Sequence, residues 1–357
     1  MPPWNDSGKN LVRDLAIAMQ RHHPHAMSVS GEIPGMPASI LEAVYRHSSR
    51  FSMNRSEQAR VLMRLACGTK HDLWHFFFAP NTRSSSASRL VRRWRNVPAI
   101  HTISSAPDPT ANLGQVLFAD RHVVLSKHTE QRLLAGGIPR EQVVRIPPGI
   151  EPGRVPEVAV AERHRESLGF AAARPILLYP GDLEFSAGAE RCLRALAQLP
   201  KTFDAHLVLA CRAKTAEASE HERRLRALAK TLGVSHAVVW LGEVSNMHQL
   251  LSAVDLVILP SEHLYAKMDY PLVLLEAMAL ERPVIVAQGT AAAELAEHDG
   301  ALAVEPDVDA IATMLGKLID NVAARHALGK RGRKDVLERF NRTTMANSYE
   351  ALYDTLL

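Results

Sequence analysis

The sequence predicts an α/β protein built from two parallel-sheet domains. Short apolar runs alternate with segments of helical spacing along nearly all of the 357 residues. This alternation is typical of parallel strands joined by crossover helices. The length exceeds that of one ordinary domain. A segment dense in proline and glycine, Pro147–Pro156, is expected to link a domain of residues 1–150 to a second of residues 157–335.

The apolar runs are the candidate strands. In the first half they are Ala26–Ser30, Leu73–Ala79, Ala99–Ile103, His122–Leu125 and Val143–Ile146. In the second half they are Ile176–Pro180, Ala205–Cys211, Ala237–Leu241, Leu256–Pro260, Val284–Ala287 and Ala301–Val304. Between them, apolar residues recur at helical spacing, as from Leu225 to Leu232 and from Ile311 to Ile319. A first helix is expected from Lys9 to about Gln20, and Pro271 suits the first position of another.

Composition excludes several classes of protein. The chain has no run of about 18 apolar residues, so no transmembrane helix is expected. The three cysteines lie far apart, which argues against a disulfide framework and a Cys-type zinc site. No secretory signal is evident at the start. We therefore expect a cytoplasmic protein, and leave open peripheral contact with the inner face of the membrane.

Charge is distributed unevenly. Residues 1–150 hold 19 Lys and Arg against 10 Asp and Glu, whereas the rest holds 23 against 28. The basic half should attract an anionic partner: acidic lipid, a phosphorylated or lipid-linked acceptor, or nucleic acid. Nucleic acid is disfavoured because the basic residues are scattered, without interleaved aromatics.

The basic segment Arg89–Arg95 contains Trp94 and has two interpretations. It is either a helix that touches an anionic membrane surface, or a solvated helix whose Trp94 docks on the core. We favour the second interpretation from the sequence.

One acidic residue stands where ligands bind in open α/β folds. Glu276 follows Pro271 within the first two turns of a predicted helix, just after the apolar strand Leu256–Pro260. The helix therefore starts at the carboxyl edge of a parallel sheet. A carboxylate there accepts hydrogen bonds from ribose or sugar hydroxyls.

This region resembles the donor-binding motif of retaining GT-B glycosyltransferases of family 4. The matching residues are Pro260, Ser261, Leu275, Glu276, Ala277, Met278, Ala279, Pro283, Val284 and Ile285. The resemblance implies two Rossmann-like, doubly wound domains facing across a cleft, with a last helix, 343–357, that completes the first domain. It also implies transfer of a hexosyl-type sugar from a nucleotide sugar to an unknown acceptor, with retention of configuration and without metal or cofactor.

The chain departs from the family at its start. Family members begin with a strand, whereas this sequence begins at the loop Pro2–Gly8 that follows it. We therefore expect the first strand to be missing, with a slot beside Ala26–Ser30 and Leu73–Ala79. A start codon assigned too late is the simplest explanation.

Four polar groups of the family's site are also changed. The Arg and Lys that hold the donor diphosphate become Asp182 and Ala187. The first Glu of a Glu pair becomes Met268, and the histidine of the first domain becomes Ser104.

The resemblance, adjusted for these changes, assigns the site residues. The donor would be bound by Gly181, Asp182, Glu184, Ser186, Val244, Ser261, Leu272, Val273 and Glu276. The catalytic group would be Glu276, Lys267, Asp269 and Ser104. The acceptor-side loop would include Ser7, Gly8, Lys9 and His75, although His75 also suits a core position.

Two functions stay open. In a rewired enzyme, Lys267 and Lys9 would neutralise the diphosphate in place of the lost cations. The alternative is a catalytically inactive partner, or a protein that only binds a nucleotide or sugar phosphate.

Overall fold

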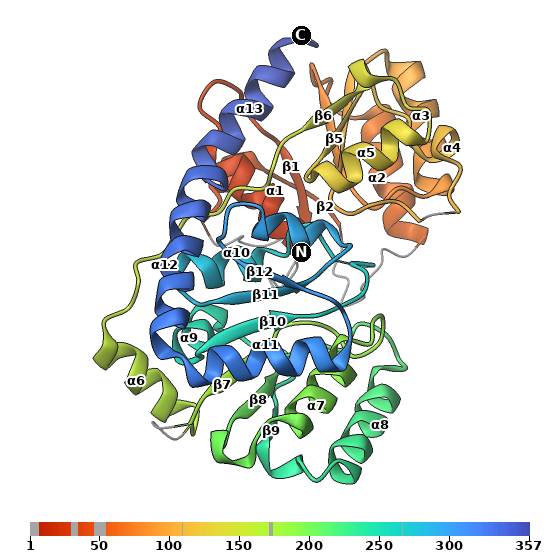
Figure 1. Cartoon of the computed structure of the whole chain (residues 1–357). Helices are drawn as coiled ribbons and strands as arrows, with labels where there is room; N and C mark the ends of the chain where they lie inside the picture. Colours follow the sequence, from red (N-terminus) through yellow and green to blue (C-terminus); the bar gives the residue numbers. More distant parts are fainter. Residues whose placement is uncertain (1–6, 30–34, 46–54, 109, 171–173, 266) are drawn as a thin grey trace. The chain divides into compact units, whose positions relative to one another are not determined.

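The computed structural model describes residues 7–29, 35–45, 55–108, 110–170, 174–265 and 267–357. The chain divides into two compact units (Figure 1). The N-terminal unit comprises residues 1–150, 267–269 and 340–357, and the C-terminal unit comprises 151–266 and 270–339. The first boundary, after Ile150, lies inside the expected linker.

The N-terminal unit contains two parallel sheets. A pair of strands, β1 (Ala26–Val29) and β2 (Leu41–Tyr45), forms the smaller one. The larger sheet has the order β3-β4-β5-β6. Its strands are β3 (Trp74–Phe77), β4 (Ala99–Ile103), β5 (Arg121–Val124) and β6 (Val143–Arg145).

Strand β2 was not predicted from the sequence. Within the described residues, β1 and β3 lie in different sheets and share no ladder. These are the strands beside which the empty slot was expected. The expectation about a missing first strand stays a prediction.

Helices join these strands, and β4 is buried along its whole length, as expected of a strand covered on both faces. The helices of this unit are α1 (Ser7–Ala18), α2 (Arg55–Cys67), α3 (Thr82–Arg95), α4 (Leu113–Val116), α5 (Lys127–Ala135) and α13 (Arg342–Asp354).

The last helix returns to this unit at the linker. Ile150 forms an isolated parallel bridge with Asn341, and its N–H donates to the Phe340 carbonyl at 2.8 Å. A β-carbon at Gly149 would lie 2.6 Å from the backbone of Arg342. Glycine is therefore required for the chain to approach the start of α13 so closely.

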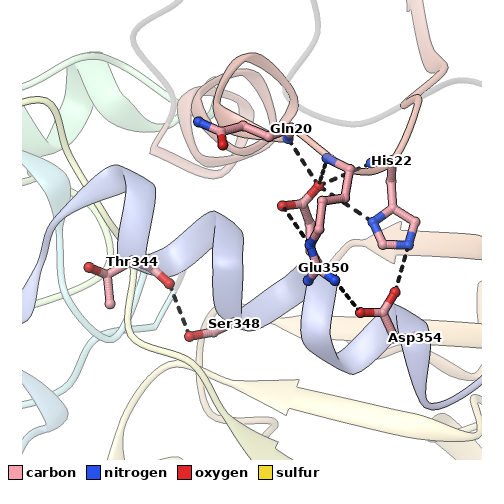
Figure 2. Close-up of polar contacts among 7 residues, drawn as sticks. Gln20, His22, Thr344, Ser348, Glu350 and Asp354 are labelled. Carbon is pink, nitrogen blue, oxygen red and sulfur yellow. Dashed lines mark hydrogen bonds and ion pairs between the residues drawn. The ribbon is translucent and has the colours of Figure 1, made fainter.

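Helix α13 also contacts α1. The side chain of Glu350, which is fully buried, accepts hydrogen bonds from three consecutive N–H groups just after α1: Gln20 at 3.0 Å, Arg21 at 2.6 Å and His22 at 3.1 Å (Figure 2). Asp354, one turn later, accepts from the Arg21 guanidinium at 2.5 Å. Burial disfavours the Glu350 carboxylate, but these hydrogen bonds outweigh it and lower its pKa.

The C-terminal unit is built on one six-stranded parallel sheet with the order β12-β11-β10-β7-β8-β9. Its strands are β7 (Ile176–Tyr179), β8 (His206–Leu209), β9 (Val238–Trp240), β10 (Leu256–Leu259), β11 (Val284–Ala287) and β12 (Leu302–Val304). Every residue of β7, β10 and β11 is buried. Continuous apolar strands of this kind require helices on both faces of the sheet.

The contacts between helices agree with two covering layers. Helix α7 contacts α8 and α11, whereas α10 contacts α9 and α12, and α9 contacts α6. The bounds are α6 (Val158–Ser167), α7 (Gly188–Gln198), α8 (Ala218–Thr231), α9 (Met247–Ala253), α10 (Leu272–Ala279), α11 (Val308–Asp320) and α12 (Val322–Arg339). The fold is thus α/β with parallel sheets in separate units, as predicted. No helix in the described part of the chain is both long and apolar enough to cross a membrane.

We expect Glu350→Gln to lower the free energy of unfolding of this protein by about 1.5–3 kcal/mol near neutral pH, since a buried charged acceptor loses its charge. The native pKa of Glu350 is depressed, so its contribution is present above the unfolded pKa of about 4.3 and disappears as the pH falls through the native pKa. The difference from wild type should therefore shrink in acid. Denaturant unfolding at neutral and acid pH measures both effects.

Ser348→Ala is the matched control, because Ser348 lies on the same helix and donates only to the exposed Thr344 carbonyl (Figure 2). It should change stability by less than about 0.5 kcal/mol. Equal losses in the two variants would show that the Glu350 contact is not what holds α13.

Candidate functional site

The order of strands in the C-terminal unit reverses between β7 and β10. Connections from β7 lead one way along the sheet and those from β10 lead the other way. In open α/β sheets, ligands bind at the carboxyl ends of the strands at such a switch point. The loop from Pro180 to Ala187 follows β7, and a loop starting at Pro260 follows β10. These two loops form the candidate site.

Hydrogen bonds join the two loops. The hydroxyls of Ser186 and Ser261 lie 3.0 Å apart. The backbone N–H of Ala187 donates to both oxygens of Glu262, at 3.1 and 3.2 Å. Glu262 also forms an ion pair with Arg191 on the second turn of α7. Two loops that are 75 residues apart in sequence therefore form one surface.

Asp182, which replaces the family's arginine, points into its own loop. Its side chain is fully buried, and Oδ1 accepts a hydrogen bond from the Phe185 N–H at 2.9 Å. The Tyr179 hydroxyl donates to the Asp182 carbonyl at 3.0 Å. These contacts stabilise the turn of the loop after β7. The predicted donor-binding role of Asp182 stays a prediction.

Arg191 was missed by the sequence analysis. It lies four residues after Ala187, which replaces the family's lysine, and residues at that spacing share one face of a helix. That spacing was the available signal. Burial opposes ionisation of its partner Glu262, but hydrogen bonds from Ala187 and Arg191 lower the pKa of Glu262 below its usual value. The pair is therefore charged at neutral pH.

Helix α10 is buried except for two partly exposed side chains. The helix begins at Leu272, one residue later than predicted, and Pro271 is its N-cap. All of its residues are buried except Val273 and Glu276, which are half-buried. Because they are three residues apart, they lie on the same face. Two of the three donor residues predicted on α10, Val273 and Glu276, thus lie on the accessible side of the helix, while the third, Leu272, is buried.

A cavity of about 240 Å³ adjoins the β7 loop. Its lining residues come from the ends of β7, β8 and β9 and from α8: Leu183, Glu184, Cys211, Arg212, Ala213, Ala218, Ser219, Glu222, Gly242 and Glu243. Arg212, Glu222 and Glu243 were not predicted, although Arg212 directly follows a predicted strand. Val244, which was predicted, is the residue after Glu243.

Glu184 connects this cavity to the start of α8. Its Oε1 accepts from the N–H groups of Lys214 at 3.0 Å and Thr215 at 2.8 Å. Its Oε2 is buried and has no hydrogen-bond partner among the described residues. A buried carboxylate oxygen without a donor is costly, so a ligand N–H or O–H would be favourable there.

Three of the predicted catalytic residues belong to the N-terminal unit: Ser104, Lys267 and Asp269. The Asp269 N–H donates to the Ser104 carbonyl at 2.8 Å. The Asp269 carboxylate accepts from the Ser126 hydroxyl at 2.5 Å. Asp269 is almost fully buried, and burial raises its pKa despite the hydrogen bonds. It thus fixes the segment 267–269 to the end of β4 and the start of α5, and a catalytic role for it stays a prediction.

Lys267 is also largely buried, and burial lowers its pKa to about 8. The fourth predicted catalytic residue, Glu276, belongs to the C-terminal unit. Its role and that of Lys267 stay predictions.

The acceptor-side residues also lie in the N-terminal unit. Ser7, Gly8 and Lys9 form the first turn of α1. His75 contacts the Tyr353 hydroxyl at 2.7 Å through Nδ1 and the Thr102 hydroxyl at 2.8 Å through Nε2. Burial holds its pKa well below the usual value, so the ring is neutral. These contacts favour the core interpretation of His75 over an acceptor-binding role.

The described residues contain no group of three or more His, Cys, Asp and Glu that could hold a metal ion.

The part of the chain that contains these two loops matches a known protein family. Residues 160–335 match the family model of glycosyl transferases group 1. N-acetyl-alpha-D-glucosaminyl L-malate synthase of Bacillus anthracis is 27% identical over 195 residues, which cover 54% of this chain and 49% of the relative. A GDP-mannose-dependent alpha-(1-6)-phosphatidylinositol monomannoside mannosyltransferase of Mycolicibacterium smegmatis is 28% identical over 333 residues, covering 87% and 83%. The chain spans about half the length of the first curated relatives it matches.

Solved structures share the fold over nearly the whole chain. The Anabaena HepE protein in complex with UDP and glucose has a TM-score of 0.81 at 18% identity, and the match covers 98% of this chain and 96% of that one. WaaG, a glycosyltransferase involved in lipopolysaccharide biosynthesis, has a TM-score of 0.72 at 18% identity, covering 96% and 95%. At these identities the likeness establishes the fold, which is that of GT-B glycosyltransferases.

The junction of the two loops predicts the effect of one substitution. A β-carbon at Gly188 would lie 2.7 Å from both the Ser261 and the Tyr179 hydroxyl oxygens. We therefore expect Gly188→Ala to force the loops apart and to destabilise the C-terminal unit by about 1–3 kcal/mol. Thermal unfolding measures the change. Gly316→Ala, in α11, meets only ordinary contacts at 3.7 and 3.9 Å and should be neutral or slightly stabilising. Similar losses at both positions would contradict the tight junction.

Proposed function

Because the chain belongs to the glycosyl transferases group 1 family, we propose that it transfers a sugar from a nucleotide-sugar donor to an acceptor. The observation that supports this most directly is the joined pair of loops at the strand switch point, with a cavity beside it. The arrangement offers separate places for a base, a diphosphate and a ribose within the C-terminal unit.

The cavity suits the nucleobase. Its volume of about 240 Å³ is lined by apolar residues such as Leu183 and Cys211 together with polar groups that can fix orientation. Glu184 offers an unpaired carboxylate oxygen to a base or ribose donor. Glu276 accepts the ribose hydroxyls in this proposal, from the accessible face of α10.

In this proposal the two loops and Arg191 bind the diphosphate. Ser186 and Ser261 offer hydroxyls, and α7 offers N–H groups at its first turn, where anions are favoured. Glu262 now occupies the N–H of Ala187 and neutralises Arg191. We infer that the donor phosphates displace Glu262 from these two groups. The site thereby regains a cation that Asp182 and Ala187 do not supply.

The reaction itself follows from the family resemblance. Retention of configuration, and catalytic roles for Glu276, Lys267, Asp269 and Ser104, are part of the proposal. The acceptor is unknown, and an anionic or lipid-linked acceptor suits the basic N-terminal half. No metal is required if side-chain cations stabilise the leaving diphosphate.

The loss of the family's two cations supports a second candidate function. A protein that binds the nucleotide but transfers no sugar would keep the cavity and Glu276 while leaving Arg191 paired with Glu262. Hydrolysis of a nucleotide sugar in the absence of acceptor distinguishes the two. Measurable hydrolysis that Glu276→Ala abolishes favours the enzyme, whereas nucleotide binding without hydrolysis favours the binding protein.

Arg191 gives a sharp test of the diphosphate site. We expect Arg191→Ala to weaken binding of nucleoside diphosphates by about 1.5–3 kcal/mol, the usual value of a hydrogen bond to a charged group, and to leave binding of the nucleoside unchanged. Glu262→Gln should strengthen diphosphate binding, because it removes a competing anion. Calorimetric titration with UDP, GDP, ADP and the matching nucleosides measures both.

Arg194→Ala is the control on the same helix. Arg194 is exposed and pairs with Glu190, so its loss should not affect nucleotide affinity. If Arg191→Ala binds as well as Arg194→Ala while Glu276→Ala loses affinity, the diphosphate does not use Arg191.

A further inference from the structure

Helix α3 presents an apolar and basic face to solvent. Leu90 is 72% exposed and Trp94 is 68% exposed, and the two are four residues apart on one face. Arg83, Ser86 and Arg93 are exposed at positions that belong to the same face. The expectation that Trp94 docks on the core is therefore wrong.

The other arginines of α3 explain why this face is turned outward. Arg89 donates to the Leu117 carbonyl at 2.8 Å, and Arg92 donates to the Phe118 carbonyl at 2.7 Å. Arg95 donates to the carbonyls of Ala66 and Gly68, at 3.2 and 3.0 Å. Three guanidinium groups thus bind backbone on the inner side of the helix. Because they fix its rotation, Leu90 and Trp94 cannot turn inward without breaking these bonds.

The neighbouring helix α2 also exposes an apolar side chain and no acidic one. Helix α2 contacts α3, and its Met63 is 66% exposed. The only acidic residue within these two helices is Glu57, which is buried. Lys70, just after α2, is exposed. The exposed side chains of the α2–α3 pair are therefore apolar, polar or cationic.

We propose that this face of α3, defined by Arg83, Ser86, Leu90, Arg93 and Trp94, binds the surface of an anionic membrane. Leu90 and Trp94 would enter the boundary between head groups and acyl chains, where an amphipathic indole is favoured. Arg83 and Arg93 would bind lipid phosphates. The charge of the face selects an anionic surface. This proposal concerns the N-terminal unit alone and does not depend on the proposed sugar transfer.

The binding should be weak and reversible. Each Arg near an anionic bilayer strengthens association by about 5.4-fold, so two of them contribute about thirtyfold, and salt screens this attraction. Two inserted apolar side chains increase the membrane affinity further, but it stays far below that of a membrane-spanning helix.

Co-sedimentation of the full chain with vesicles tests the proposal. We expect binding to vesicles of phosphatidylcholine and phosphatidylglycerol in equal amounts at low salt, and much less binding to phosphatidylcholine alone. Arg83→Gln with Arg93→Gln should lower the partition coefficient by about thirtyfold. Leu90→Ser with Trp94→Ser should lower it at least tenfold, including at higher salt.

Two controls separate this face from general charge and general exposure. Arg223→Gln with Arg224→Gln removes two exposed arginines on α8, and Val158→Ser removes an exposed apolar side chain on α6. Both controls should bind as wild type, and circular dichroism should show all variants folded. The proposal is overturned if the wild type binds neither vesicle, which would point to an acidic protein partner instead. It is equally overturned if the α3 variants bind as tightly as the controls.

Discussion

The reversal of strand order between β7 and β10 is the constraint on which the C-terminal unit depends. At this point the connections from β7 and from β10 lead to opposite halves of the sheet, and such a switch point is where ligands bind in open α/β folds. Ser186, Ser261 and the cavity beyond Leu183 are all placed by it. The buried strands make this placement rigid, because β7 and β10 have no solvent-facing side from which to shift.

In the proposed function, the charge of the donor diphosphate would be balanced by different residues from those of the family pattern. Losing two cations near a diphosphate would leave repulsion that a helix N-terminus alone does not offset, since its effect is equivalent to about half a charge. Two features of the structure bear on this repulsion. Asp182 is buried in its loop, where its carboxylate accepts a hydrogen bond from the Phe185 N–H. Arg191, on the second turn of α7, forms an ion pair with Glu262 in the loop after β10.

Much of this architecture was predictable from the sequence, because parallel strands buried on both faces are continuous apolar runs and their helices show clear spacing. All six strands of the C-terminal sheet were predicted. Strand β2 was missed because Leu41–Tyr45 includes Glu42 and gives no continuous apolar run. The donor-binding residues predicted on α10 came from a motif with fixed spacing, and their role stays a prediction. The pairing of Arg191 with Glu262 was missed because it joins positions 71 residues apart, and the only local signal was the spacing of Arg191 from Ala187.

Trp94 shows where local reasoning fails for a different reason. A tryptophan in a helix is expected to bury its ring, and the sequence around it offers five arginines in α3 that look equivalent. Three of them bind backbone carbonyls, and that choice sets which face of the helix remains outside. The orientation of α3 is therefore set by the carbonyls of Leu117, Phe118 and Ala66, which lie outside the sequence of α3.

The connection from β10 to α10 adds a final constraint. It begins with Ser261 and Glu262 in the C-terminal unit, contributes residues 267–269 to the N-terminal unit, and returns at Tyr270. Asp269 is buried near the α10 end of this connection and is held by bonds to Ser126 and Ser104. Tyr270 is fixed in turn, since its hydroxyl donates to Glu294 at 2.5 Å. A ligand that displaces Glu262 therefore acts on a segment whose far end is already fixed. If donor phosphates displace Glu262, as proposed, the fixed contacts of Asp269 and Tyr270 favour a small rearrangement of side chains over a large motion of the loop.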